Sequence, residues 1–188
     1  MYYLLQCRLL QIKVVAKMGR AVAVTRKCAQ FLNSRLFSRV VCTLALCHLD
    51  YCSVVWSAAS SSHLLSKLQV AQNKAARLVL GCSLRTSVAE MHDRLAWLGV
   101  KHRLSANMLV YFHKIINTRT PKFLYDNIIY YSDMHSHYTR GANSHQISLP
   151  LPKSDSLKKT VFYRSIVLWN NLPGGVREIK GKTGLKKR

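Results

Sequence analysis

The sequence is poor in acidic side chains. Only seven Asp and Glu stand against 29 Lys and Arg among 188 residues, which gives a net charge of +22. The acidic residues are scattered, and the one close pair, Glu90 and Asp93, lies beside basic residues on an expected helix face. A two-metal phosphoryl-transfer site needs clustered carboxylates. The absence of such a cluster in the sequence argues against that class of enzyme.

The six cysteines lack the spacing of a zinc site. The sequence has no Cys-x-x-Cys pair, and Cys42, Cys47 and Cys52 recur every fifth residue, which turns them to different faces of a helix. Buried thiols are favoured over zinc. Arg8 and Lys13 interrupt the apolar N-terminus before a signal-peptide core is complete. We therefore expect an intracellular protein, nuclear or cytoplasmic, with reduced thiols and no cofactor.

The histidines and cysteines offer two further readings. His135, His137 and His145 lie in a polar, turn-prone stretch, where a solvated loop is favoured over a metal site because partner cysteines and an i, i+4 pair are missing. A Cys–His nucleophile could be formed by Cys47 with His48, or by Cys82 with His92. Nothing in the sequence orients either pair, so we expect no catalytic residues.

The longest apolar run, residues 42–57, contains His48 and Asp50. Both would lie near the middle of a bilayer, where charged side chains are costly. We expect instead a buried helix in which Asp50 is hydrogen-bonded or faces an interface, and no membrane association. The excess of basic residues attracts polyanions. Nucleic acid is the first candidate, ahead of anionic membrane or acidic protein.

Helical periodicity predicts a mainly α fold. The expected helices cover residues 1–32, 35–56, 63–80, 87–98, 103–117, 121–131 and 155–171. Residues 146–152 read as an extended edge segment because of Pro150 and Pro152. The inward positions expected on two helices are Leu9, Ile12, Ala16, Ala23 and Val24 on the first, and Leu104, Met108, Tyr111, Phe112 and Ile115 on that of 103–117.

Helix boundaries are marked by specific residues. Asn33-Ser34 and the serine-rich stretch 57–62 predict N-caps, and Ser87 with Glu90 forms a capping-box pattern. Gly81 and Gly99 are expected to end helices. In the helix of 63–80, the positions Leu64, Leu68, Ala71, Ala75 and Leu78 line one face, with Lys67, Lys74 and Arg77 on an adjacent flank. That flank is either an ordinary solvated surface or a phosphate-binding stripe.

Four phrases occur in a distinctive order. They are HLDYCSVVWS at 48–57, KLQVAQNKAARLVLGC at 67–82, MHDRLAWLGVKHRL at 91–104 and YTRGANSHQISLPLPKSDSLKKTVFYRSIVLWNNLP at 138–173. In this order they resemble the C-terminal portion of reverse transcriptases from non-LTR (LINE-type) retrotransposons, over residues 20–173. That portion comprises the thumb and the helical region beyond the polymerase palm.

The resemblance implies a thumb-like helical array that lies near the template–primer backbone. The expected segments are a basic helix at 1–33, a helical core at 34–132, a loop, extended segment and helix at 133–173, and a flexible basic tail at 174–188. The expected partner is RNA or an RNA–DNA hybrid, bound through phosphate, with the chain itself or an intact element polymerase as further partners. The expected contacts are Arg35, Arg39, Lys67, Lys74 and Arg77, together with the tail.

The chain departs from the family in two respects. It contains no (Y/F)-x-D-D motif, so no polymerase metal ligand can be assigned to any position, and its end after Pro173 is rich in Gly and Lys instead of continuing as a helix. We therefore expect a truncated or decayed element copy that is not an enzyme. Trp97 and Tyr111 could stack on bases but are more typical of a core. Trp56 and Trp169 are assigned to the core or to a lost palm interface.

A protein-interaction role is the alternative. A helix as apolar as 35–56 would be left partly uncovered without a palm, and it would then associate hydrophobically or fold only marginally.

Overall fold

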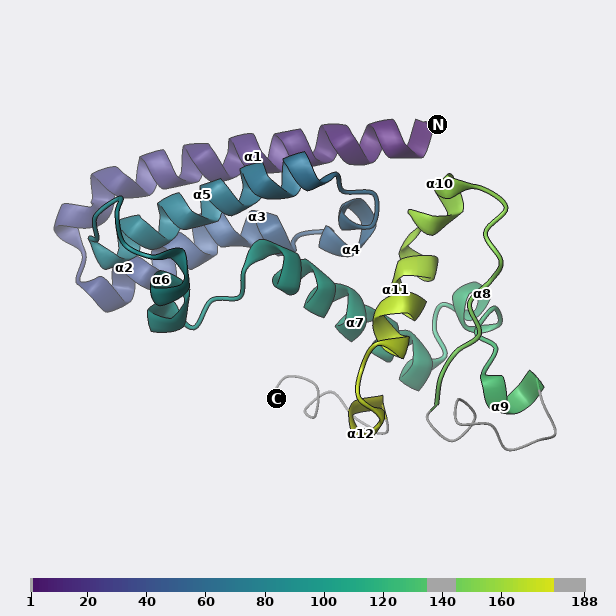
Figure 1. The fold of residues 1–188 in the computed structure, drawn as a ribbon. Coiled ribbons are helices and arrows are strands. Elements are labelled where there is room, and N and C mark those ends of the chain that lie inside the picture. The colour runs from purple at the N-terminus through teal and green to yellow at the C-terminus, as the bar shows by residue number, and fades with distance from the viewer. Residues whose placement is uncertain (1, 135–144, 178–188) are drawn as a thin grey trace. The chain divides into compact units, whose positions relative to one another are not determined.

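The computed structural model describes residues 2–134 and 145–177, with side chains from Leu5 onward. Within these ranges the regular structure is helical and no strand forms, so the expectation of a mainly α fold is confirmed (Figure 1). The chain divides into two compact units, Met1–Leu104 and Ser105–Arg188, and the boundary falls inside one helix, α7. His135, His137 and the end of the basic tail lie outside the described residues.

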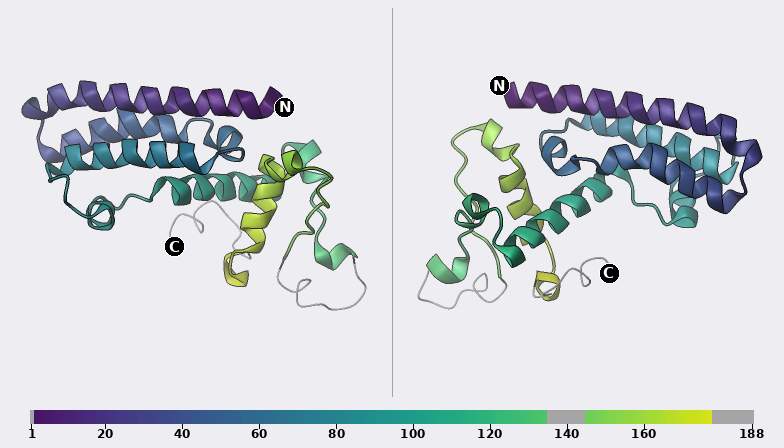
Figure 2. Two further views of the ribbon diagram at one scale, coloured as in Figure 1. Left: turned by 45° about the horizontal axis from the view of Figure 1, so that its top comes forward. Right: turned by 180° about the vertical axis from the view of Figure 1, so that it is seen from behind.

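The first unit is built on three long helical segments that run side by side (Figures 1 and 2). The first is α1 and the third is α5. The middle one is a composite of α2, a π-helical segment and α3. The bounds are α1 Tyr2–Cys28, a 3₁₀ turn Ala29–Phe31, α2 Ser34–Val41, the π segment Cys42–Leu46, α3 Cys47–Asp50, α4 Ser53–Ser57, α5 Ser62–Leu80, α6 Val88–Leu95 and α7 Val100–Thr118.

Two apolar clusters hold this unit together. One surrounds Trp56 and Leu68 and includes Met18, Leu46, Leu49, Ala71, Val100 and Leu104. The other joins Val22 of α1 and Phe37 of α2 to Ala75 of α5, with Val41 and Ala45. Trp97 packs on both clusters while only partly buried. Trp56 is 1% exposed, which confirms its assignment to the core.

The long first helix is confirmed, but the prediction of its inward face is wrong. Leu9 is 58% exposed and Ile12 is 52% exposed, and Ala16, Ala23 and Val24 are exposed as well. The buried face consists of Cys7, Gln11, Met18, Val22 and Thr25. Two of these residues are polar: the Thr25 hydroxyl and the Gln11 side-chain NH₂ donate hydrogen bonds, while the Gln11 Oε1 is buried without a partner. Hydrophobicity alone therefore pointed to the opposite side of the helix.

The polar residues on the buried face of α1 have identifiable partners. The Gln11 side-chain amide donates to the Trp56 carbonyl at 2.7 Å and to the Ser60 hydroxyl at 2.9 Å. The Thr25 hydroxyl donates to the carbonyl of Ala21, one turn earlier in the same helix. A buried polar group costs little when it is hydrogen-bonded. These contacts explain why α1 turns this side inward.

The predicted continuous helix over 35–56 is interrupted. It passes through the π segment and ends at Asp50, and the chain then turns at Cys52, whose φ is +50°. The Trp56 indole N–H donates to the Tyr51 carbonyl at 3.1 Å, which gives a partner to a carbonyl next to the break. The sequence has no Gly or Pro here to signal the turn. The break is instead stabilised by a side chain five residues later.

Several helix boundaries are confirmed and two are corrected. The Asn33 and Ser61 side chains accept the backbone N–H groups of Leu36 and Leu64, and Gly81 closes α5 with a φ of +60°. Ser87 occupies the N-cap of α6, but its side chain makes no capping bond. The left-handed residue that ends α6 is Ala96, so Gly99 does not end it.

The second unit contains the rest of α7 and several short helices. These are α8 Lys122–Tyr125, α9 Tyr131–Met134, α10 Asp155–Lys158, α11 Val161–Asn170 and α12 Gly174–Arg177. Its core joins Phe112 and Ile115 of α7 to Ile147, Ile166 and Trp169. The Phe112 and Trp169 rings meet edge to face with centroids 6.0 Å apart. Trp169, at 2% exposure, is therefore a core residue.

Three predictions in this unit are corrected. Tyr111 is 36% exposed, so it does not point inward with its neighbours Leu104, Met108, Phe112 and Ile115. The helix expected over 121–131 is reduced to α8 and the separate α9. The helix expected over 155–171 is broken between α10 and α11, where Thr160 caps α11 by accepting the Tyr163 N–H. Because Thr160 favours an N-cap over a helix interior, a second helix begins there.

Candidate nucleic-acid interface

The flank of α5 presents two of the predicted contact residues to solvent. Lys67 and Lys74 are exposed, while Leu64, Leu68, Ala71 and Ala75 of the same helix are buried. Seven residues correspond to two helical turns, so the two ammonium groups start from backbone positions about 10.5 Å apart along the axis. Arg77 differs from them because its side chain is half-buried, and its Nε is enclosed without a hydrogen-bond partner.

Arg35 and Arg39 lie on another surface of the first unit. Both are exposed on α2, and each is two positions from the buried Phe37. Residues two apart on a helix point to nearly opposite sides. The two arginines therefore face away from the core that α2 shares with α5. The structure brings Lys67 and Lys74 together but leaves Arg35 and Arg39 as a separate pair.

A groove of about 450 Å³ lies beside Lys67 and Lys74, between α1 and α5. Its lining is mostly aliphatic, and the polar groups are a histidine, a serine and the two lysines. The lining residues are Val15, Gly19, Val22, His63, Ser66, Lys67, Val70, Ala71 and Lys74. Helical spacing predicted the two lysines on one flank but not the groove, because the apolar residues of α1 indicated the wrong inward face.

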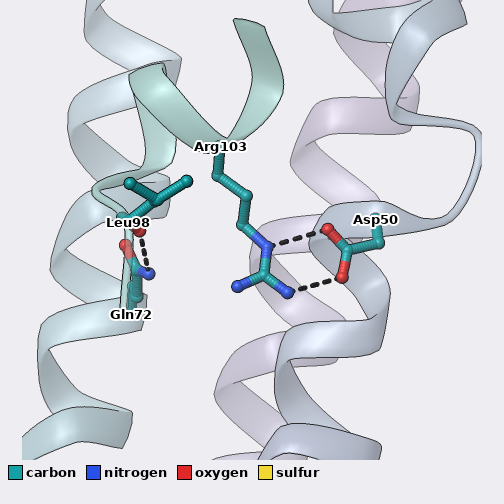
Figure 3. Close-up of polar contacts among 4 residues, drawn as sticks. All are labelled: Asp50, Gln72, Leu98 and Arg103. Atoms are coloured by element: carbon teal, nitrogen blue, oxygen red, sulfur yellow. Dashed lines mark hydrogen bonds and ion pairs between the residues drawn. The ribbon is translucent and has the colours of Figure 1, made fainter. Parts of the chain in front are cut away.

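Neither helix beside this groove contains an acidic residue. Between Met1 and Ala89 the sequence holds a single carboxylate, Asp50. Arg103 binds that carboxylate with two hydrogen bonds, at 2.8 Å from Nε and 2.6 Å from Nη2 (Figure 3). The cations of α1 and α5 therefore have no acidic neighbour on their own helices, and a concentrated positive field attracts polyanions.

The Asp50–Arg103 pair joins two of the distinctive sequence phrases. Asp50 ends α3 and Arg103 lies in the first turns of α7. The hydrogen bond to Asp50 raises the pKa of the Arg103 guanidinium, so Arg103 stays charged at every ordinary pH. The expectation that Asp50 is hydrogen-bonded is confirmed. Its side chain is 42% exposed, however, so it lies at the surface of the first unit.

A second polar contact joins the phrase at 67–82 to the phrase at 91–104. The Gln72 side-chain amide, fully buried on α5, donates to the Leu98 carbonyl at 2.8 Å (Figure 3). One turn earlier, the side-chain oxygen of Gln69 accepts the Val100 N–H at 2.8 Å, at the start of α7. The two glutamine side chains thus pair with backbone groups of Leu98 and Val100, where α6 connects to α7. Both glutamines belong to the phrase at 67–82, and their role is structural.

Asn73 extends the same network. Its side-chain oxygen accepts from the Gln69 amide at 2.9 Å and lies 3.2 Å from the His92 Nε2. Burial lowers the pKa of His92 below its ordinary value, and the nearby Asp93 opposes this. His92 is thus held mainly neutral near pH 7, as a hydrogen-bonding group that fixes α6 against α5.

The WNNLP phrase forms the corresponding contact in the second unit. Asn170 donates to the Ile147 carbonyl at 2.8 Å and accepts the Ile147 N–H at 2.9 Å, as a neighbouring strand would. The adjacent Trp169 indole donates to the His145 carbonyl at 3.1 Å. Ile147 also forms an isolated antiparallel bridge with Tyr130. The segment expected to be extended at 146–152 is therefore held by one side chain and one bridge.

Metal-binding and membrane-spanning features are absent from the part of the chain that the structure describes. No three His, Cys, Asp or Glu side chains gather there in a way that could hold a metal ion. No described helix combines the length and the apolar character needed to cross a bilayer. The six cysteines are unpaired, but only Cys7 is buried, and Cys47 and Cys52 are exposed, so the expectation of buried thiols is wrong for these two. Partial burial raises the pKa of Cys42, which keeps that thiol protonated.

Comparison of this chain with protein-family models, with curated proteins and with solved structures finds no match. The resemblance to retrotransposon reverse transcriptases therefore rests on the four sequence phrases. In the structure, residues from three of these phrases contact one another in the first unit. Residues of the fourth phrase, Trp169 and Asn170, form hydrogen bonds with His145 and Ile147 in the second unit.

Proposed function

We propose that this chain is a non-catalytic, phosphate-directed nucleic-acid-binding protein, related to the thumb and post-palm region of LINE-type reverse transcriptases. It acts inside the cell, in the nucleus or cytoplasm, on RNA or an RNA–DNA hybrid. Lys67 and Lys74 contact phosphate directly. Arg35 and Arg39 contact it from the second basic surface, and Arg77 supports the first from its half-buried position.

One observation carries this proposal: α1 and α5 combine many cations with no acidic residue. The cations are Arg8, Lys13, Lys17, Arg20, Arg26, Lys27, Lys67, Lys74 and Arg77. Except for the half-buried Arg77, these cations are exposed. The one carboxylate before Glu90, Asp50, is paired with Arg103, so the surface charge of the two helices is of one sign. Phosphate contacts of this kind position a protein without reading base sequence.

The direct test is a salt titration of binding. The full chain is first checked for a cooperative melt and then titrated against a labelled RNA–DNA primer–template hybrid between about 50 and 200 mM salt. Phosphate contacts release counterions, so log affinity should fall linearly with log salt, with a slope of about −0.7 to −0.9 per contact. A hybrid of unrelated sequence should bind equally well.

Two results would reject this function. Binding that is insensitive to salt would indicate apolar association, since added salt weakens ionic contacts and not hydrophobic ones. Binding that appears only with aggregates, in a chain without a cooperative melt, would indicate a marginally folded protein with no nucleic-acid role. Both results would favour the interaction role named above as the alternative.

A further inference from the structure

The groove between α1 and α5 exposes apolar surface that the chain itself leaves uncovered. Val15, Gly19 and Val22 form its α1 side, and Val70 and Ala71 form its α5 side. Val70 is 53% exposed. Leu9 and Ile12 of α1 are also more than half exposed. Contiguous exposed apolar surface of this kind marks an interaction site.

Gly19 is not required by the fold of this unit. It lies in the middle of a 27-residue helix, where a glycine is less favourable than an alanine. A Cβ atom at Gly19 would meet no atom within 4 Å, so no neighbour forbids a side chain there. Because Gly19 has no side chain, the floor of the groove is open at this position.

The geometry of the groove suits a third helix. Two helices packed side by side leave a shallow channel parallel to their axes, and an amphipathic helix can lay its apolar face into such a channel. Phosphate binding by itself would need the lysines but no aliphatic floor. The aliphatic lining between Val15 and Val70 therefore points to a partner with apolar side chains.

The charge around the groove defines the chemistry of that partner. His63, Ser66, Lys67 and Lys74 form the polar part of the lining, and no acidic residue occurs in either helix. A second copy of this chain, at +22, would be repelled. An acidic partner would be attracted and would pair its carboxylates with the lysines at the rim.

We propose that the groove binds an amphipathic helix of an acidic partner protein. The partner's apolar row packs on Val15, Gly19 and Val70. Two of its Asp or Glu residues, seven positions apart, reach Lys67 and Lys74, because those lysines are also two helical turns apart. This site goes beyond the proposed nucleic-acid function and does not depend on it.

The test uses the full chain and three synthetic helical peptides of about three heptads. One carries leucines in a heptad pattern with Glu on both flanks, one carries Lys in place of Glu, and one is a scrambled form of the Glu peptide. Binding is measured by fluorescence anisotropy. We expect the Glu peptide to bind at least tenfold more tightly than either control. No binding of the Glu peptide at 100 µM, or equal binding of its scrambled form, would overturn the proposal.

Gly19→Leu separates the groove from general charge attraction. This variant fills the floor, so the Glu peptide should bind at least tenfold more weakly while the melting temperature does not fall. Ala89→Leu, which adds the same side chain at an exposed position of α6, should leave peptide binding within twofold. If Gly19→Leu lowers the melting temperature, Val70→Gln provides the same test at an exposed position and should weaken the peptide at least threefold.

The nucleic-acid hybrid is measured on the same variants. Gly19→Leu should leave hybrid affinity within twofold, since it removes no charge. A loss of hybrid affinity in Gly19→Leu as large as the loss of peptide affinity would mean that nucleic acid occupies the groove, and the helix proposal would be rejected. Failure of the peptide to bind, with normal salt-dependent hybrid binding, would reject only the helix site and leave the proposed function standing.

Discussion

The two units are stabilised by different kinds of contact. The first unit packs long helices along their lengths, and its distinctive polar residues, such as Gln72 and Asp50, fasten one helix to the next. The second unit has shorter helices and irregular segments, and it concentrates its apolar contacts around Trp169 and Phe112. A helix-rich unit can distribute its core over many small contacts, whereas a loop-rich unit depends on a few large side chains.

The units also differ in how they distribute charge. The long helices of the first unit, α1 and α5, carry basic residues and no acidic ones. In the second unit, α9 and α10 contain Asp133 and Asp155, and Asp155 forms an ion pair with Lys158 at 2.9 Å. Mixed charge is typical of a solvated helix surface. This difference is the reason for placing the nucleic-acid interface on the first unit.

Truncating the central tryptophan of each unit should produce the largest effects. We expect Trp56→Ala and Trp169→Ala each to destabilise the protein by about 3–5 kcal/mol. Hydrogen exchange would show which amides lose protection. Trp169→Ala should expose residues 105–134 and 145–177 while protection in α1 and α5 persists, and Trp56→Ala should do the reverse. Loss of protection throughout the chain in both variants would show that the two units unfold as one.

Removing the side-chain amides that hold backbone segments should have the next largest effect. Gln72→Ala empties a fully buried site and removes the donor of the Leu98 carbonyl, and Asn170→Ala leaves both Ile147 backbone groups unpaired. An unsatisfied buried polar group costs about 1–3 kcal/mol, so each variant should lose about 2 kcal/mol in chemical denaturation. Two exposed amide residues serve as controls, Gln6→Ala on α1 and Asn171→Ala next to Asn170. Each should change the free energy of unfolding by less than about 0.5 kcal/mol. Equal losses in controls and variants would show that these contacts contribute nothing specific.

Breaking the Asp50–Arg103 pair should have a smaller effect. The Arg103 side chain is 24% exposed and that of Asp50 is 42% exposed, so solvent screens the attraction. We expect Arg103→Gln to cost about 1 kcal/mol at low salt, and less in 1 M salt. Arg103→Lys should recover only part of the loss, because a lysine cannot form the two parallel bonds. A cost that does not change with salt would show that the arginine acts through packing alone.

The smallest expected effect is a dependence of stability on pH through His92. Burial lowers the pKa of His92 in the folded state, so the unfolded chain binds a proton more readily. The stabilisation of the folded state by neutral His92 is complete above the pKa of about 6.5 in the unfolded chain. It is lost as the pH falls through the pKa of His92 in the folded state. The melting temperature should therefore drop less between pH 7.5 and 5.5 in His92→Asn than in the wild type. An identical drop in both proteins would remove His92 as a cause.

The parts of the fold that could be predicted from sequence are those with local signals. The N-caps Asn33 and Ser61, the terminator Gly81 and the periodic face of α5 gave correct helices because each signal acts within one or two turns. The break at Cys52 and the buried face of α1 could not be predicted. The break depends on a side-chain bond from Trp56 to Tyr51 that no pattern of the sequence marks, and the buried face of α1 depends on a long-range bond from Gln11 to Trp56.

The candidate site was predictable to a similar degree. Helical spacing placed Lys67 and Lys74 on one exposed flank, as the structure has them. It also grouped Arg77 with them, but Arg77 is half-buried and does not line the groove. The groove itself needed α1 to be placed against α5. A glycine at the centre of an otherwise strong helix, Gly19, was the one sequence signal that could have indicated it.

The central claim is that phosphate binds to the first unit through its unopposed cations. The most direct measurement compares the salt dependence of hybrid binding for two variants of equal charge, Lys67→Gln/Lys74→Gln in the first unit and Lys114→Gln/Lys153→Gln in the second, where both lysines are also exposed. The claim predicts that the first variant reduces the slope of log affinity against log salt by about 2, and the second by less than about 0.5. Equal reductions in both variants would contradict it, because binding would then follow net charge and not the surface of α5.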